Sequence, residues 1–189
     1  AEARKLAEAE PDEKRRKELL QIAETCDQVP EKPARTFREA IQSMYIYQTC
    51  IFMEQNAASY NPGRMDQYLY PFYKADIEAG RLTEEEAQEL LDCLWVKFSE
   101  QCLFQDQVTA QFSAGYPMFQ NVCCGGVDER GMDAVNDVSY LIFAGNRRST
   151  VISAVSVCPL QYGEESEQLL KEDCRGYQAW NRFPGISQR

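Results

Sequence analysis

The chain has 189 residues, of which 30 are acidic and 20 basic, so its formal net charge is −10 and its isoelectric point lies near 4.6. This acidic balance argues against a nucleic-acid partner, because a phosphate-binding surface needs an excess of basic side chains. No apolar run of about 18 residues occurs and no apolar signal segment follows the first charged residues. We therefore expect no membrane partner and a cytoplasmic protein.

Eight cysteines and the lack of histidine limit the available chemistry. Five of the cysteines fall inside helical apolar patterns, which favours buried thiols in a reducing compartment over disulfides: Cys26, Cys50, Cys93, Cys102 and Cys174. No CxxC pair is present, so we expect no metal site. Without histidine, neither a Ser-His-Asp nor a Cys-His arrangement is possible.

The first part of the chain is predicted to be helical. Residues 1–35 form a charged helical arm, in which a second helix begins near Pro11. Its apolar side chains predict a buried stripe: Leu19, Leu20, Ile22, Ala23 and Cys26. Thr36 with Glu39 predicts a capping box and the start of the next helix.

A further helical segment, residues 66–79, is expected to break near Pro71 and to stop at Gly80. Thr83 with Glu86 predicts another capping box. The helix that follows has the clearest amphipathic pattern in the chain, formed by Ala87, Leu90, Leu91, Leu94, Trp95, Phe98 and Cys102.

Helices and strands alternate in the second half. The predicted elements are a short strand closed by two glycines, a helix stopped by Gly145, a second strand and a final helix, over residues 118–124, 133–144, 151–158 and 164–175. This alternation favours a parallel α/β arrangement. The expected fold class is therefore helix-rich α/β.

Two segments, residues 61–73 and 112–122, combine a turn-forming Pro or Gly with an Arg or Ser and several aromatic side chains. Such a composition suits a pocket wall better than a solvent loop. They belong to an ordered series of short motifs, over residues 36–42, 54–56, 63–71, 121–122, 125–126, 133–134 and 139–141. In these motifs the chain resembles the glycyl radical enzymes, the family of pyruvate formate-lyase, glycerol dehydratase, choline trimethylamine-lyase and hydroxyproline dehydratase.

The resemblance implies a ten-stranded α/β barrel built from two five-stranded half-sheets and wrapped by helices. It divides residues 1–189 into the helical arm 1–35, core helices with the first strand over 36–144, and a divergent strand-helix tail over 145–189. The family's Gly-Cys-x-Glu-type and Arg-Val-x-Gly-Tyr-type loops do not occur in the sequence. We therefore expect an internal fragment that lies upstream of the active cysteine loop, is inactive alone and carries no catalytic residue.

By the same resemblance, the intact enzyme is expected to be an anaerobic eliminase or dehydratase acting on a small polar or carboxylated molecule. In this family a glycyl radical generates a cysteine thiyl, which abstracts hydrogen from the substrate. That radical would lie in a later part of the enzyme, so this chain is expected to bind no cofactor. The implied partners are the rest of the barrel, a radical-SAM activating enzyme and a second copy of the enzyme.

Two alternatives stay open within the family, formate C-acetyltransferase and aryl-acid decarboxylase. A third, from another class, is a non-catalytic helical scaffold fragment. The adjacent pair Cys123–Cys124 resembles the two cysteines through which pyruvate formate-lyase relays its radical, but it lies in the strand before Gly125-Gly126. We interpret the pair as small buried strand residues.

Five residues are candidates for substrate binding. Arg64 could anchor a substrate carboxylate, or it could pair with Asp66 or another buried carboxylate and fix the loop. Asn56 and Ser59 lie in an Asn-Ala-Ala-Ser run where related enzymes often carry Asn-Gly-His-Ser; the Ser59 hydroxyl could bind a substrate oxygen, or serve a turn.

Ser113 and Phe119 flank a Gly-Tyr-Pro turn and match positions that line the cavity in hydroxyproline dehydratase-like enzymes. A hydroxyl and an aromatic wall are suited to orienting a small polar substrate. The alternative is an ordinary strand entry with a packed phenylalanine.

Overall fold

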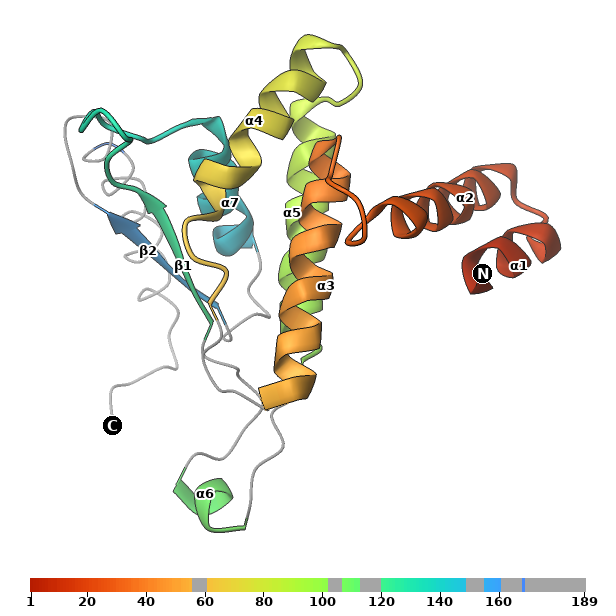
Figure 1. Cartoon of the computed structure of the whole chain (residues 1–189), viewed down its shortest axis with the longest axis horizontal. Helices are drawn as coiled ribbons and strands as arrows, with labels where there is room; N and C mark the ends of the chain where they lie inside the picture. Colours follow the sequence, from red (N-terminus) through yellow and green to blue (C-terminus); the bar gives the residue numbers. More distant parts are fainter. Residues whose placement is uncertain (56–60, 102–106, 113–119, 149–154, 161–167, 169–189) are drawn as a thin grey trace, which may run out of the picture.

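The computed structural model describes residues 1–55, 61–101, 107–112, 120–148, 155–160 and 168 (Figure 1). These ranges contain seven helices and two strands: α1 Glu2–Ala9, α2 Glu13–Gln28, α3 Phe37–Gln55, α4 Met65–Glu78, α5 Glu84–Ser99, α6 Gln107–Phe112, β1 Gln120–Gly125, α7 Asp137–Arg148 and β2 Val155–Leu160. The predicted helix-rich α/β class is confirmed. None of the helices in these ranges is both long enough and apolar enough to cross a membrane.

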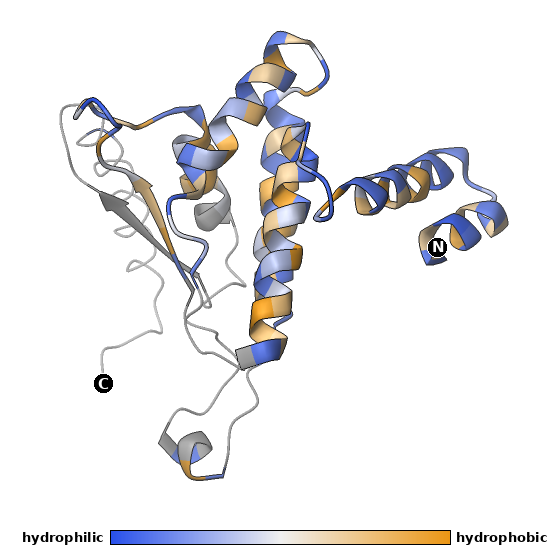
Figure 2. Ribbon diagram, in the orientation of Figure 1, coloured by the Kyte–Doolittle hydropathy of each residue, from blue (hydrophilic) through white to orange (hydrophobic). Residues whose placement is uncertain are grey.

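Helices α1 and α2 form an arm that lies to one side of the other elements (Figure 1). The Asp12 carboxylate caps α2 by accepting hydrogen bonds from the backbone N–H groups of Lys14 and Arg15, at 2.8 and 3.3 Å. The buried stripe of α2 is narrower than predicted: Leu20 and Ile22 are 41% and 40% exposed. Both lie on sides of α2 that its neighbours leave uncovered, and Figure 2 shows that the arm is mostly hydrophilic.

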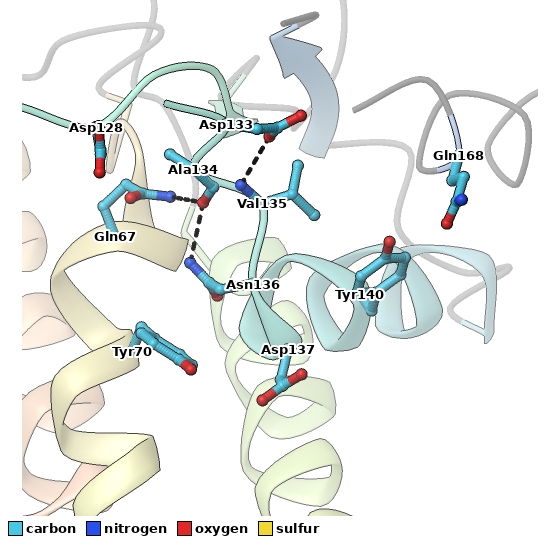
Figure 3. A pocket seen from close by; sticks show the side chains of 10 residues that line it. All are labelled: Gln67, Tyr70, Asp128, Asp133, Ala134, Val135, Asn136, Asp137, Tyr140 and Gln168. Atoms are coloured by element: carbon cyan, nitrogen blue, oxygen red, sulfur yellow. Dashed lines mark hydrogen bonds between the residues drawn. The ribbon is translucent and has the colours of Figure 1, made fainter. Parts of the chain in front are cut away.

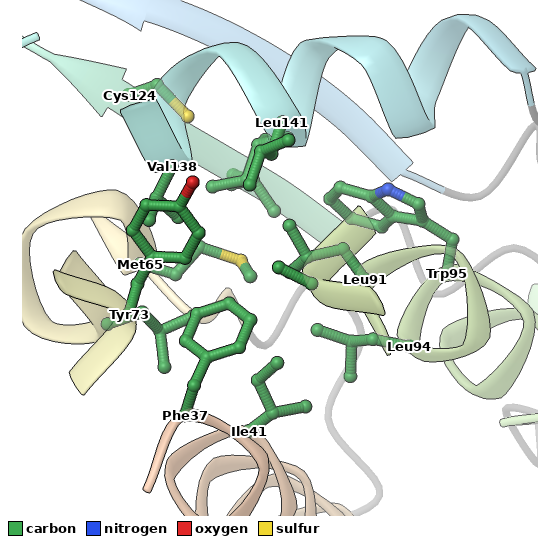
Figure 4. Close-up of a cluster of buried hydrophobic side chains, with 14 of the residues drawn as sticks. Phe37, Ile41, Met65, Tyr73, Leu91, Leu94, Trp95, Cys124, Val138 and Leu141 are labelled. Carbon is green, nitrogen blue, oxygen red and sulfur yellow. The ribbon is translucent and has the colours of Figure 1, made fainter. Parts of the chain in front are cut away.

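The hydrophobic core lies where α3, α4, α5 and α7 meet (Figure 4). Phe37, Met65, Leu91, Trp95 and Ile142 are almost fully buried there. The predicted amphipathic face of α5 is confirmed over the residues that the helix contains: Leu90 is partly buried, and the others are buried, namely Ala87, Leu91, Leu94, Trp95 and Phe98. The predicted Thr83–Glu86 capping box is also confirmed, with both of its reciprocal hydrogen bonds present.

The start of α3 is capped differently from the prediction. The backbone N–H of Glu39 donates to the Thr36 hydroxyl at 3.2 Å, as expected. The Glu39 carboxylate, however, accepts from the backbone N–H of Arg35 at 2.7 Å and from the Arg35 guanidinium. Asp76 of α4 supplies a further cap, accepting from the Phe37 N–H at 2.8 Å. A carboxylate distant in the sequence therefore helps to close the helix end.

Helix α4 is continuous through Pro71, so the predicted break is wrong. Pro71 is exposed, and α4 continues through it without the hydrogen bond that an N–H at this position would donate. The predicted stop at Gly80 is confirmed. Gly80 has φ +65°, and the N–H groups of Gly80 and Arg81 donate to the carbonyls of Ile77 and Asp76 at 3.0 and 2.9 Å. This pair of bonds is a Schellman motif.

Strands β1 and β2 are parallel, with a register that runs from Gln120 opposite Val155 to Gly125 opposite Leu160. The other edge of β1 pairs with the segment before α4. Gly63 forms a parallel bridge with Val122, and the Cys123 N–H donates to the Gly63 carbonyl at 3.1 Å. Three parallel segments therefore lie in the order 61–63, β1, β2.

Helix α7 begins at Asp137, whereas the sequence predicted a start at residue 133. It continues through Gly145, where the sequence predicted its end. Asn136 caps it by accepting from the Val138 N–H at 3.0 Å. A Cβ atom at Gly145 would overlap the indole of Trp95 on α5, so this glycine allows two helices to approach closely and does not end one. The predicted strand start at 151 and the predicted helix over 164–175 lie outside the described residues, except for Gln168.

The prediction of buried thiols is wrong for Cys26, Cys50 and Cys93, which are exposed. Cys93 lies two residues from the buried Leu91, and side chains two apart on a helix point to opposite sides. Cys102 and Cys174 lie outside the described residues. In the strand, Cys124 is buried and Cys123 is half-buried.

Candidate functional site

Of the five predicted substrate-binding residues, the structure describes Arg64. Asn56, Ser59, Ser113 and Phe119 lie outside the described residues, so their roles remain predictions. Their positions in the chain are still informative, because Ser59 stands two residues before Asn61, and Phe119 one residue before β1.

Arg64 occupies the N-cap position of α4 and is half-buried. Its Nη2 donates to the carbonyl of Gly125, at the end of β1, over 2.5 Å. The Nε of Arg64 is buried and has no hydrogen-bond partner among the described residues. The ion pairs in this part of the chain do not include one between Arg64 and Asp66, so the pairing that we considered from the sequence is not formed.

Asp66 is the second residue of α4, two positions after Arg64, and is fully buried. Its Oδ2 accepts from the backbone N–H of Gly125 and from the Ser139 hydroxyl, each at 2.7 Å. Arg64 and Asp66 therefore hold the carbonyl and the N–H of the same residue. Gly125 has φ +72°, a conformation that favours glycine, so the chain can turn sharply at this point.

We call Arg64, Asp66 and Ser139 the Gly125 clamp. A second set of bonds supports it from the loop after β1. Gln67 Nε2 donates to the Ala134 carbonyl at 2.8 Å, and Asn136 Nδ2 donates to the Asp66 carbonyl at 3.4 Å. The beginnings of α4 and α7 and the end of β1 are thereby fixed at one point. Charged hydrogen bonds in a buried setting are among the stronger ones in proteins.

The two segments that the sequence singled out meet next to the Gly125 clamp. Asn61 Oδ1 accepts from the Asn121 N–H at 2.6 Å, and Gly63 pairs with Val122. The segment that follows Asn56 and Ser59 thus lies directly beside the strand that follows Ser113 and Phe119. Two motifs separated by about sixty residues meet in the fold.

A cavity of about 580 Å³ opens beside the clamp, between α4, α7 and the loop after β1 (Figure 3). Its lining is Gln67, Tyr70, Asp128, Asp133, Ala134, Val135, Asn136, Asp137, Tyr140 and Gln168. Three carboxylates give it a negative potential, which would repel a carboxylated substrate. Arg64, the one predicted site residue that the structure describes, is not part of this lining, and we do not assign the substrate site to the cavity.

Asp128 in this lining is held in its ionised form. The backbone N–H groups of Met132 and Arg130 donate to its carboxylate at 2.9 and 2.8 Å. These bonds keep the pKa of Asp128 below its usual value, the bond from Met132 contributing most. The carboxylate therefore stays charged and shapes the loop, which argues against a role as a general acid near neutral pH.

Sequence reasoning considered Asp66 only as a partner for Arg64, and it assigned no role to Gln67, Asn136 or Ser139. The N-cap role of Asn136 had a local signal, because Asn is a favoured residue before an apolar helical run. The contacts of Asp66 had no local signal in the sequence, because Gly125 and Ser139 lie 59 and 73 residues away from it.

Comparison with known proteins places this arrangement in a family. Residues 1–151 match the family model described as pyruvate formate lyase-like. Trans-4-hydroxy-L-proline dehydratase of Clostridioides difficile is 45% identical over 142 residues, which are 74% of this chain and 18% of that protein. Indoleacetate decarboxylase of Tractidigestivibacter scatoligenes is 34% identical over 188 residues, 96% of this chain and 21% of that protein.

Among solved structures, hydroxyproline dehydratase from Clostridioides difficile with bound trans-4-hydroxy-L-proline superposes with a TM-score of 0.86 at 38% identity. That match covers 94% of this chain and 23% of the other. The chain thus spans about a fifth of the length of the relatives that it matches. It belongs to the pyruvate formate lyase-like family of glycyl radical enzymes.

Proposed function

We propose that this chain is a segment of a glycyl radical eliminase or dehydratase that acts on a small polar or carboxylated molecule. The observation that carries the proposal is its family membership, together with 45% identity to a trans-4-hydroxy-L-proline dehydratase. In the proposed enzyme this chain contributes outer helices and strands to one half of a ten-stranded barrel.

The arrangement of the sheet supports this role. Helices cover the side of β1 on which Val122 and Cys124 are buried. Parallel sheets are normally covered on both faces, so the opposite side of β1 calls for further structure. We assign that covering to the rest of the barrel, with the substrate cavity on the same side.

The contribution of this chain to the reaction would be binding and orientation. When present, the glycyl radical supplies the hydrogen-abstracting chemistry through a cysteine outside this sequence. Ser113 would offer a hydroxyl to the substrate and Phe119 an apolar wall that excludes water. Asn56 and Ser59 would add polar contacts from the neighbouring segment.

Arg64 has a different proposed part. Its bond to Gly125 supports the end of β1, the strand that directly follows the predicted substrate residue Phe119, so Arg64 would act on the substrate through the position of β1. The partners proposed for the intact enzyme are a radical-SAM activating enzyme and a second copy of itself. We propose an anaerobic, cytoplasmic setting.

The test is turnover by the intact polypeptide that contains this sequence, activated without oxygen. Trans-4-hydroxy-L-proline and a small polyol represent elimination, and product is measured by mass spectrometry. We expect Ser113→Ala to lower kcat/KM by about 2- to 13-fold, the equivalent of one hydrogen bond of about 0.5–1.5 kcal/mol, with radical content unchanged. Ser43→Ala on α3 is the matched control and should leave kcat/KM unchanged. Turnover of neither substrate class, despite full radical content, would overturn the assignment to elimination.

A second candidate is decarboxylation of an aryl acid. It is favoured by the indoleacetate decarboxylase match, which extends over 96% of this chain. Indole-3-acetate belongs in the same assay for this reason. Release of carbon dioxide from it, with no elimination product from the other substrates, would select this candidate.

A further inference from the structure

Two buried polar atoms of the Gly125 clamp have no hydrogen-bond partner in the part of the chain that the structure describes. One is Nε of Arg64 and the other is Oδ1 of Asp66. The Asp66 side chain is fully buried, and its other oxygen, Oδ2, already accepts two bonds. Because a buried polar atom without a partner is unfavourable, we expect each of the two atoms to bind a further group.

Both atoms lie beside the same residue, Gly125. Nε and Nη2 of Arg64 are bonded to one guanidinium carbon, and Nη2 donates to the Gly125 carbonyl. The two oxygens of Asp66 are bonded to one carboxyl carbon, and Oδ2 accepts from the Gly125 N–H. Since Nε and Oδ1 are both without a partner, they are not bonded to each other. A single group beside Gly125 would satisfy both of them.

The charges of the two side chains determine what can bind there. The Arg64 guanidinium only donates hydrogen bonds, and the Asp66 carboxylate only accepts them. Asp66 would repel an anion on Nε, and Arg64 would repel a cation on Oδ1. The group that fits both atoms is neutral, accepts as well as donates, and is small, because both atoms are buried. Water has these properties, and buried waters typically bond to polar groups that otherwise lack a partner.

We propose that one buried water binds between Arg64 Nε and Asp66 Oδ1, accepting a hydrogen bond from the first and donating one to the second. The guanidinium and the carboxylate are then joined on one side by the water and on the other by the N–H and carbonyl of Gly125. Water-mediated bonds of this kind are enthalpically nearly as favourable as direct ones. Both atoms are already buried within this chain, so the water site is independent of the proposed reaction and of the rest of the enzyme.

The test is a crystal structure of the intact polypeptide that contains this sequence, at a resolution that shows ordered water. We expect one water within hydrogen-bond distance of both Arg64 Nε and Asp66 Oδ1. Four results would overturn the site: a direct bond between the two atoms, a protein group bonded to either of them, separate waters on the two atoms, or no water on either.

Two variants show whether the guanidinium holds the water. Arg64→Met has a side chain of similar reach but no donor, so we expect the water to be lost while Asp66 Oδ2 keeps its bonds from Gly125 and Ser139. Arg16→Met, at an exposed position of α2, is the matched control and should retain the water. A water that stays in place in Arg64→Met would contradict the bond from Nε. If that variant does not fold, the structure of the unsubstituted polypeptide decides alone.

Discussion

Replacing Asp66 with alanine is the sharpest perturbation of the Gly125 clamp. The carboxylate is fully buried and accepts two hydrogen bonds of 2.7 Å, from the Gly125 N–H and the Ser139 hydroxyl. The substitution leaves both donors buried without their acceptor. A buried donor that loses its partner costs about 1–3 kcal/mol. The expected destabilisation is therefore roughly 2–6 kcal/mol, provided that the two costs add.

Equilibrium unfolding in urea, followed by far-ultraviolet circular dichroism, measures this loss through the helices. With a denaturant slope of about 2 kcal/mol/M, the midpoint should fall by about 1–3 M. Glu89→Ala, which removes an exposed carboxylate on α5, is the control and should change stability by less than about 0.5 kcal/mol.

Ser139→Ala separates the two bonds. It removes one donor and leaves the bond from Gly125 to Asp66, so alone it should cost about 0.5–1.5 kcal/mol. In the Asp66→Ala background it should cost less, because the hydroxyl has already lost its acceptor and keeps only the bond that it accepts from the Asn136 N–H at 3.1 Å. The double-mutant cycle should thus show coupling of about 0.5–3 kcal/mol. Additive effects, or a loss below about 1 kcal/mol for Asp66→Ala, would refute the clamp.

Three further predictions concern the helices. Leu94→Ala empties a buried site on α5 and should lower the free energy of unfolding by about 2–5 kcal/mol in a urea titration; a loss below about 1 kcal/mol would contradict its place in the core. Gly145→Ala forces a Cβ into the Trp95 indole and should cost about 1–3 kcal/mol, whereas an unchanged midpoint would show that the helices can separate at no cost. Hydrogen bonding to Arg35 keeps the pKa of Glu39 below its usual value, so the stabilising contribution of Glu39 is complete above the unfolded pKa of about 4.3 and is lost as pH falls through the folded pKa. Glu39→Gln should therefore make the urea midpoint depend less on pH between about pH 3 and pH 5 than it does in the unsubstituted chain. An unaltered pH dependence of the midpoint would argue against the bond.

Local signals predicted the helix ends that are closed by local bonds. The Thr83–Glu86 box spans three residues, so its pattern is legible in the sequence alone. The same holds for Gly80, whose left-handed backbone ends α4. The Thr36 box was only half right, because a nearby arginine offered Glu39 a better partner than the Thr36 N–H. Competition between neighbouring groups is not visible in a motif.

Features that depend on distant partners were missed or misassigned. Gly145 was predicted as a stop because glycine often ends a helix, but its function here is set by Trp95, fifty residues earlier in the chain. Asp66 accepts hydrogen bonds from both Gly125 and Ser139 because α4 and α7 meet at the end of β1. No local sequence pattern predicts that meeting. The resemblance of motifs identified the family without the fold, since several motifs in order are specific even where each is short.

The measurement that tests the central claim most directly is electron paramagnetic resonance of the intact polypeptide containing this sequence, after anaerobic incubation with its radical-SAM activating enzyme. Our account predicts the doublet of a backbone glycyl radical in the intact polypeptide, and no such signal from the 189-residue chain treated in the same way. A doublet from the chain alone, or no radical in the fully folded intact polypeptide after activation, would contradict it.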